Sequence, residues 1–411
     1  MAINDLFLCP QEWVDDGAKD FVSLVRKWAD REIISKRHEY RLNYEDLFIE
    51  KRLKLIGDIG LERLVLPESY GGYGWNEPAG ASGITAVLSE VGRADAAIGF
   101  ALAIKFALFS VIAMKPSISD VLCDTLVPLS FTEGINDVTL ILPGAGVADS
   151  ETPLFFGRSV ISRIEKTDGG YSITGDKLRP VGCGRNASLY CVVCSTGEGE
   201  IVLAFVPSET EGVVRGDAIK DTGLNACKNA DITFDNAIIP AENVICREGS
   251  VLELYSWLNL FLSAVTLGAA FNFFEIVHEW AETRVIKGGV VMKENPLCAY
   301  VLADVAGEIA TAKLLCYSLA QSFAGSEQYG GIGGQAIYTY AQMTGERVHR
   351  GVVKAINRGM ELMGSAGYSK EWHVEKHWRD VKTIQSHLSG IGADVPVKMD
   401  IARYFYQCKE L

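Results

Sequence analysis

The sequence predicts an α+β fold in which a central sheet lies between two helical regions. Three observations lead to this prediction. Apolar residues recur at helical spacing up to about residue 125, short β-branched and aromatic segments follow up to about 245, and helical spacing returns from 246 onward. We therefore predict an N-terminal helical domain over 1–125, a central antiparallel sheet or small barrel over 126–245, and a C-terminal helical domain over 246–411.

The first helical region contains three periodic segments and one loop. The helical segments read FVSLVRKWADREI, YEDLFIEKRLKLIGDIGL and ITAVLSEVGRADAAIGFALAIKFALFSVIAM. Between the second and third, LVLPESYGGYGWNEPAG concentrates Gly, Pro and Asn, which indicates a loop.

The central and last regions differ in the period of their apolar residues. Segments such as GGYSITGDK, SLYCVVCS, EIVLAFVPS and ADITFDNAIIP have the composition of short strands. After them, WLNLFLSAVTLGAAFNFFEIVHEWAETRV, LCAYVLADVAGEIATAKLLCYSLAQSF and GQAIYTYAQMTGERVHRGVVKAINRGMELM have the spacing of long helices.

Composition narrows the class of protein. A net charge of −13 argues against a nucleic-acid binder, since phosphate attraction needs clustered Lys and Arg. We also expect no membrane insertion, because charged and polar residues interrupt every apolar run before it reaches roughly 18 residues. The first residues, MAINDLFLCPQEWVDD, lack the pattern of a signal peptide, so we expect a cytoplasmic protein.

Two short sequence patterns resemble metal-binding motifs, but neither has the additional ligands or the residue order that a metal site needs. Cys191 and Cys194 form the one C-x-x-C pair among ten cysteines, and neither a second pair nor histidines follow it. We expect buried, reduced thiols on a strand. HVEKH at 373–377 has two histidines four apart, but not in the H-E-x-x-H order of zinc proteases. We predict no metal site.

Several segments in order resemble the acyl-CoA dehydrogenase family across nearly the whole chain. They are LVLPESYGGYGW, LSFTEG (129–134), PGAGVAD (143–149), FDNAIIPAENVI (234–245) and GSAGYSKEWHVEKHWRDVK (364–382). The resemblance implies a helical domain, a β-domain and a C-terminal four-helix bundle, in a homotetramer. It also implies FAD between the β-domain and the C-terminal helices, partly contacted by a neighbouring subunit. The family removes a proton from Cα and a hydride from Cβ of an acyl thioester.

The catalytic base of the family has no counterpart at its usual position. Counting from Arg379–Asp380 places the usual Glu near Leu388 or Ser389, and counting back from Arg403 places it near Ile391. A second family position, on the first long helix of the C-terminal domain, falls near Leu258. Because none of these residues is acidic, two substitutes are candidates. They are Asp95 in GRADAAIGF and His387, which could accept a proton near neutral pH.

The expected FAD contacts are partly altered. Val181 stands where the family has a Thr hydroxyl facing flavin N5, and Pro180 before it lacks an N–H. The resemblance implies that Thr132 and Arg284 contact FAD, and that Gly364 and Gly367 let the backbone approach its phosphates. The Phe that normally follows the Arg284 position is missing, since Lys287 takes its place.

Three functions are compatible with this pattern. The first is a divergent flavoprotein that oxidises an acyl thioester with a relocated base, such as one acting on a cyclic or conjugated acyl group. The second is a redox-neutral decarboxylase, eliminase or cyclase on the same scaffold, with or without FAD. The third is a non-catalytic subunit paired with an active paralogue in a hetero-oligomer. The expected partners are acyl-CoA or an acyl-carrier-protein thioester, and an electron-transfer flavoprotein as acceptor.

Overall fold

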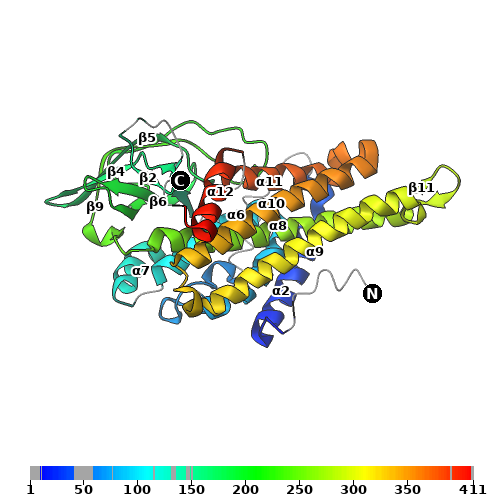
Figure 1. Ribbon diagram of the computed structural model, residues 1–411, viewed down its shortest axis with the longest axis horizontal. Helices are drawn as coiled ribbons and strands as arrows, with labels where there is room; N and C mark the ends of the chain where they lie inside the picture. The colour runs from blue at the N-terminus through cyan, green and yellow to red at the C-terminus, as the bar shows by residue number, and fades with distance from the viewer. Residues whose placement is uncertain are drawn as a thin grey trace.

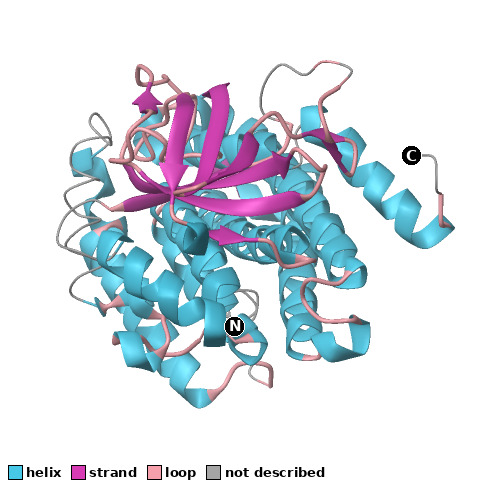
Figure 2. Cartoon of the chain, turned by 90° about the vertical axis from the view of Figure 1, so that its left-hand side faces the viewer, coloured by secondary structure: helices cyan, strands magenta, loops and turns pink. Residues whose placement is uncertain are grey.

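A computed structural model describes residues 10, 12–40, 59–75, 77–113, 116–130, 136–144, 149, 151–388 and 391–408. The sheet lies at one end of an elongated molecule, and the long C-terminal helices extend away from it (Figure 1). Seen from the sheet end, the strands lie across the upper part of the molecule, with helices behind and below them (Figure 2). The α+β architecture that the sequence predicts is confirmed, with helices before and after a central sheet domain.

The α-helices fall into two groups. Those before the sheet are α2 (Asp16–Glu32), α3 (Arg37–Tyr40), α5 (Ala81–Ala94), α6 (Ala96–Ala113) and α7 (Pro116–Ser130). Those after it are α8 (Ser250–Thr283), α9 (Pro296–Ala324), α10 (Gln335–Met363), α11 (Val374–Leu388) and α12 (Ile391–Tyr406). Short 3-10 turns are η1 (Ile34–Lys36), η2 (Leu61–Arg63), η3 (Glu68–Tyr70), η4 (Pro78–Gly80), η5 (Ala241–Asn243), η6 (Met292–Glu294), η7 (Ser326–Tyr329), η8 (Gly364–Tyr368) and η9 (Lys370–Trp372).

The central sheet has eight strands and is mixed. Its strands are β1 (Asp137–Ile141), β4 (Arg163–Thr167), β5 (Gly170–Leu178), β6 (Ala187–Thr196), β7 (Ile201–Pro207), β8 (Val213–Arg215), β9 (Ile232–Ile239) and β10 (Val244–Ile245). The order is β10-β7-β6-β4-β5-β9-β8, with β1 also pairing with β6. Five of its strand pairs are antiparallel, as expected, whereas β1 and β4 run parallel to β6. A parallel pair needs a crossover connection, which the segment between β1 and β6 provides.

Two short hairpins lie outside this sheet. One joins β2 (Leu154–Phe155) to β3 (Arg158–Ser159), and the other joins β11 (Val285–Ile286) to β12 (Val290–Val291). The second hairpin projects beyond the end of α8, far from the sheet (Figure 1).

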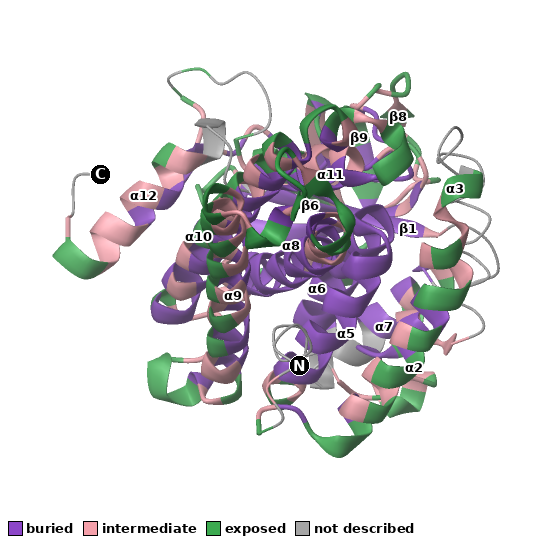
Figure 3. Cartoon of the chain, turned by 90° about the vertical axis from the view of Figure 1, so that its right-hand side faces the viewer, coloured by how far each residue is buried: buried purple, intermediate pink, exposed green. Residues whose placement is uncertain are grey.

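Helix α8 forms the centre of the helical part. It packs against α5, α6, α9, α10 and α11. By length and composition it could cross a membrane, but 83% of its most apolar window is buried within the fold (Figure 3). Its apolar character is therefore that of a core helix.

Two glycines bring α5 and α8 into backbone contact. A Cβ on Gly268 would lie 2.0 Å from the carbonyl oxygen of Ser89, and one on Gly92 would lie 2.3 Å from that of Val265. No side chain fits at either position, so glycine sets how closely the two helices cross.

The cysteine pair lies on β6 and points to opposite faces of the sheet. Cys191 packs into the core shared with the helices, and Cys194 into the smaller core on the other face. Both thiols are buried and free, as expected, and burial raises the pKa of each. Within the described ranges, no group of His, Cys, Asp or Glu has the arrangement of a metal site, the HVEKH histidines included.

Candidate active site

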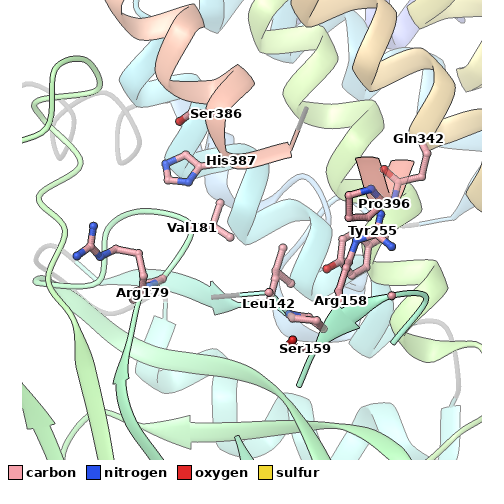
Figure 4. A pocket seen from close by; sticks show the side chains of 14 residues that line it. Leu142, Arg158, Ser159, Arg179, Val181, Tyr255, Gln342, Ser386, His387 and Pro396 are labelled. Carbon is pink, nitrogen blue, oxygen red and sulfur yellow. The ribbon is translucent and has the colours of Figure 1, made fainter. Parts of the chain in front are cut away.

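A cavity of about 420 Å³ lies where the sheet domain meets the C-terminal helices (Figure 4). Its lining comes from the turn after β1, the β2–β3 hairpin, the end of β5, and helices α8, α10, α11 and α12. The lining residues are Leu142, Pro143, Gly144, Gly157, Arg158, Ser159, Arg179, Pro180, Val181, Tyr255, Gln342, Ser386, His387 and Pro396.

Of the two proposed bases, His387 lies in this cavity. It occupies the last turn of α11, near Val181, with its ring 6.0 Å from that of Phe100 (Figure 4). Burial and the positive charge of Arg179 lower the pKa of His387 to about 4. At neutral pH the imidazole is therefore uncharged, with a nitrogen lone pair available to accept a proton.

Asp95 lies elsewhere and already has partners. Its carboxylate caps α6 by accepting hydrogen bonds from the N–H groups of Ala97 (2.7 Å) and Ile98 (3.2 Å). Its other oxygen lies 2.6 Å from Lys376, which also pairs with Asp380. Asp95 is 5% exposed and is not among the cavity residues. The geometry accounts for Asp95 as a helix cap, and its role as base stays a prediction.

The resemblance places the family's two usual base positions near Leu258 and at the start of α12. Leu258 is fully buried, and the neighbouring Asn259 donates its amide N–H to the carbonyl of Tyr255 and to Gln342. The other position falls at the junction of α11 and α12, where Ser389 lies outside the described residues.

Val181 and Pro180 form an apolar stretch of the cavity wall. Pro180 has no N–H, and the N–H of Val181 donates to the carbonyl of Leu140 (2.9 Å). The next residue is Gly182. A Cβ at this position would lie 2.4 Å from the ring of Phe100, so no side chain fits there. This stretch has neither a hydroxyl nor a backbone N–H to offer a ligand.

The turn after β1 is apolar as well. The resemblance places the family's Thr-Glu pair at 132–133, followed by an insertion before the Pro-Gly-Ala-Gly stretch. In the structure β1 ends at Ile141, and Leu142 leads directly into Pro143. Thr132 lies outside the described residues, so its assignment to the cofactor site stays a prediction.

Arg179 provides one positive charge at the cavity. Its guanidinium bonds both carboxylate oxygens of Asp231, at 2.5 and 3.1 Å, and its side chain is half exposed. This two-point contact fixes the orientation of the guanidinium. Sequence reasoning had not selected Arg179, although it directly precedes the altered Pro180–Val181 pair.

The opposite end of the cavity is a buried polar network. The Asp400 carboxylate accepts hydrogen bonds from Arg158 (2.8 Å), the Tyr338 hydroxyl (2.7 Å) and Arg403 (2.8 Å). Gln342 donates to the Tyr338 oxygen (3.0 Å). Burial raises the pKa of Tyr338 well above its usual range, so its hydroxyl stays protonated and donates to Asp400. Sequence reasoning missed this network because Asp400 lies 62 residues from Tyr338 and 242 residues from Arg158.

The remaining predicted cofactor residues lie on other elements. Arg284 ends α8, where its guanidinium stacks 5.4 Å from the Trp280 ring. Gly364 follows α10 at φ 62° and ψ −137°, a backbone conformation that only glycine adopts readily. Gly367 is buried, and a Cβ there would lie 2.4 Å from the carbonyl oxygen of Met360. None of the three lines the cavity.

The cavity fits a ligand rich in hydrogen-bond acceptors. It offers two guanidinium groups, the hydroxyls of two serines and Tyr255, an amide and an imidazole, and no described lining residue is Asp or Glu. The flavin ring, with its carbonyl oxygens and ring nitrogens, matches this donor set. The match is weakest at Val181, which is apolar.

Solved structures identify the fold. Butyryl-CoA dehydrogenase from Megasphaera elsdenii aligns with a TM-score of 0.76 and 19% identity over 94% of this chain and 97% of that one. Glutaryl-CoA dehydrogenase from Mycobacterium smegmatis gives 0.78 and 17% over 96% of each chain. A chain from work on the electron transferring flavoprotein of Acidaminococcus fermentans gives 0.78 and 18%, over 96% and 99%. At these identities the likeness establishes the acyl-CoA dehydrogenase fold.

Sequence comparison establishes the family. The N-terminal domain model of acyl-CoA dehydrogenases matches residues 15–115, and the C-terminal domain model matches 260–390. Cyclohex-1-ene-1-carbonyl-CoA dehydrogenase of Syntrophus aciditrophicus (strain SB) is 26% identical over 89% of this chain and 85% of its own length. The mitochondrial short/branched chain specific acyl-CoA dehydrogenase of Bos taurus is 25% identical over 97% and 88%. The chain belongs to the acyl-CoA dehydrogenase family, FAD flavoproteins that act as oxidoreductases on CH–CH bonds.

Proposed function

We propose that this chain oxidises an acyl-CoA thioester in the cavity between the sheet domain and the C-terminal helices, with His387 as the base. The observation that carries the proposal is the position of His387 in the same cavity as Val181. Burial lowers the pKa of His387 to about 4, so that its imidazole is free to accept a proton at neutral pH. In the family, the residue at the Val181 position faces the reactive edge of the flavin. His387 therefore lies where a proton acceptor could reach a thioester held against that edge.

The proton passes from a neutral C–H group of the acyl thioester to the neutral imidazole of His387. An imidazole nitrogen of His387 takes a proton from a carbon conjugated with the thioester carbonyl, which is Cα in a saturated acyl group and Cγ in a cyclic 1-ene acyl group that has no Cα hydrogen. The C–H electron pair remains on the thioester as an enolate or dienolate, and the imidazole becomes imidazolium. FAD would supply the acceptor for the hydride, which leaves Cβ in a saturated group and the other ring carbon bonded to Cα in a cyclic 1-ene group, so that one new C=C bond remains. The lowered pKa makes His387 a weak base. The imidazolium that forms is therefore stabilised by the negative charge of the enolate beside it. Arg179, held by Asp231, adds a positive charge near that enolate.

The acyl group that we propose is cyclic or conjugated. Relatives from two organisms are named cyclohex-1-ene-1-carbonyl-CoA dehydrogenase, each at 26% identity. Moving the base away from the usual position near Ile391 is consistent with removing a proton from a differently placed carbon. CoA is the carrier that these names support, and an electron-transfer flavoprotein remains our proposed acceptor.

The apolar part of the cavity wall favours a second candidate function. Val181 lines the cavity where the family presents a Thr hydroxyl to flavin, and Leu142 adds a second apolar side chain to the lining. A redox-neutral reaction on an acyl thioester, or a non-catalytic subunit beside an active paralogue, would tolerate this loss.

Flavin content separates the two candidates. Protein purified without added cofactor should absorb near 450 nm, with about one flavin per chain. Val181→Thr, which restores a hydroxyl at the N5-facing position, should slow flavin loss during dialysis. A colourless protein that stays colourless after incubation with FAD would exclude oxidation by this chain.

The base is tested by His387→Gln. We expect turnover of cyclohex-1-ene-1-carbonyl-CoA to fall by about 10²-fold or more, with its binding affinity nearly unchanged. His278→Gln is the matched control, since His278 is a half-exposed histidine on α8 beside Glu282. Asp95→Asn should lower thermal stability, because it weakens the α6 cap and the ion pair with Lys376. Full activity of His387→Gln, with activity lost in a stable Asp95→Asn protein, would transfer the role to Asp95.

A further inference from the structure

A second cavity of about 390 Å³ lies on the other side of the β2–β3 hairpin. Phe155 and Phe156 line this second cavity, whereas the next residues of the same turn, Gly157 and Arg158, line the first. Along α8 the two cavities lie about one turn apart, since Leu252 lines the second and Tyr255 lines the first. The hairpin is therefore the wall between them.

Side-chain contacts hold this wall in place. The rings of Phe155 and Tyr255 stack with centroids 5.9 Å apart, and those of Phe156 and Tyr338 at 5.6 Å. Behind the rings, Arg158 pairs with Asp400 of α12 at 2.8 Å. The hairpin is thus fastened to α8, α10 and α12 at once.

The hairpin backbone contributes little stability of its own. Each strand has two residues, and the pair forms a sheet separate from the main one. Isolated two-stranded hairpins are marginal in water. In the turn, Phe156 has φ 47° and Gly157 has φ 76°. Positive φ at both central positions suits Asn-Gly, and a bulky phenylalanine there is strained.

We propose that the β2–β3 hairpin is a gate that a ligand spanning both cavities must open. A strained turn held by side-chain contacts has the properties of a two-state element: it is ordered when the contacts form, and it releases strain when they are lost. The inference rests on the proposed function for the ligand. An acyl thioester carries its acyl group on a long phosphopantetheine arm, which is a chain suited to occupying two neighbouring cavities in sequence. Closing the gate shields the first cavity from water, and opening it admits the arm.

Phe156→Asn tests the gate without removing the hairpin. Asparagine is favoured at this turn position, so the variant should relieve strain and keep the fold, while losing the ring that separates the cavities. The probe is the S-(cyclohex-1-enylmethyl)-CoA thioether, which carries the proposed cyclic group, lacks the thioester carbonyl and binds without reacting. We expect its association rate, followed by stopped-flow fluorescence, to rise on the order of tenfold in Phe156→Asn. Phe405→Asn is the matched control, because Phe405 is a half-exposed ring on α12 outside both cavities.

Amide hydrogen exchange in the full-length wild-type protein provides a second measurement. Binding of this thioether should speed exchange in residues 154–159 by roughly tenfold, whereas exchange in the core of α10 stays unchanged or slows. If the thioether binds but neither the association rate in Phe156→Asn nor exchange in the hairpin changes, the gate is wrong and the proposed function stands. If the thioether fails to bind wild type and variant alike, the proposed function and the gate both fail.

Discussion

Replacing Asp400 by alanine removes the carboxylate that joins the β2–β3 hairpin, α10 and α12. Asp400 is 2% exposed and Arg158 is 8% exposed, so the ion pair between them is buried. Removing one partner of a buried pair costs about 3–5 kcal/mol, mainly because the other charge stays buried without compensation. The Tyr338 hydroxyl loses its acceptor in the same variant.

The loss should be local, and amide exchange under native conditions measures it. We expect protection in α12 and in residues 154–159 to fall by about a hundredfold or more, as about 1.4 kcal/mol corresponds to a factor of ten. Protection in α8, which is central to the helical core, should change much less. Single-residue resolution matters here, since a chain with separate sheet and helical parts need not unfold in one step.

Two further variants test whether the loss of stability comes from the buried, unpaired charge. Arg158→Met with Asp400→Leu replaces the charged pair by apolar groups, and we expect it to recover most of the lost stability. Asp394→Ala breaks a more exposed ion pair on the same helix, with Arg350, and should cost below about 1 kcal/mol. If Asp400→Ala costs no more than Asp394→Ala, the buried network does not hold the hairpin and α12 together.

Two other predictions concern stability. His349 is fully buried, and burial lowers its pKa to about 4 from an ordinary 6.5. The unfolded chain therefore binds this proton more readily, so stability should fall as pH drops from about 6.5 to 4, by up to about 3 kcal/mol for this group; thermal melts should show a shallower decline in His349→Gln than in wild type, and parallel curves would count against it. Gly268→Ala places a methyl group 2.0 Å from the Ser89 carbonyl oxygen, so the helices must separate; we expect a loss of about 2 kcal/mol or more in chemical denaturation, and an unchanged midpoint would contradict that close contact.

The order of helical and strand-rich regions could be predicted from the sequence, because it follows from local periodicity. The spacing of apolar residues identified α8, α9 and α10, and β-branched segments identified β6, β7 and β9. Strand direction could not be predicted in the same way. The parallel pairing of β1 with β6 depends on the path of the intervening chain, which the composition of either strand does not reveal.

The same distinction between local sequence and chain path applies to the candidate site. The resemblance to the family predicts that the usual acid near Ile391 and the hydroxyl at the Val181 position are missing, because those positions follow from short motifs. It also selected His387, which the fold places in the cavity. Asp95 was chosen by the same reasoning, and only the fold shows that α6 and Lys376 engage its carboxylate.

The sequence alone therefore determined the family and the helix–sheet–helix order, since each of these depends on residues close together in the chain; the relocated base remains a prediction. Only the tertiary structure decided which charges share the cavity. Arg158 and Asp400 meet across 242 residues, and Arg179 and Asp231 across 52. The energy of such pairs depends on distance and burial in space, and neither quantity can be read from separation along the chain.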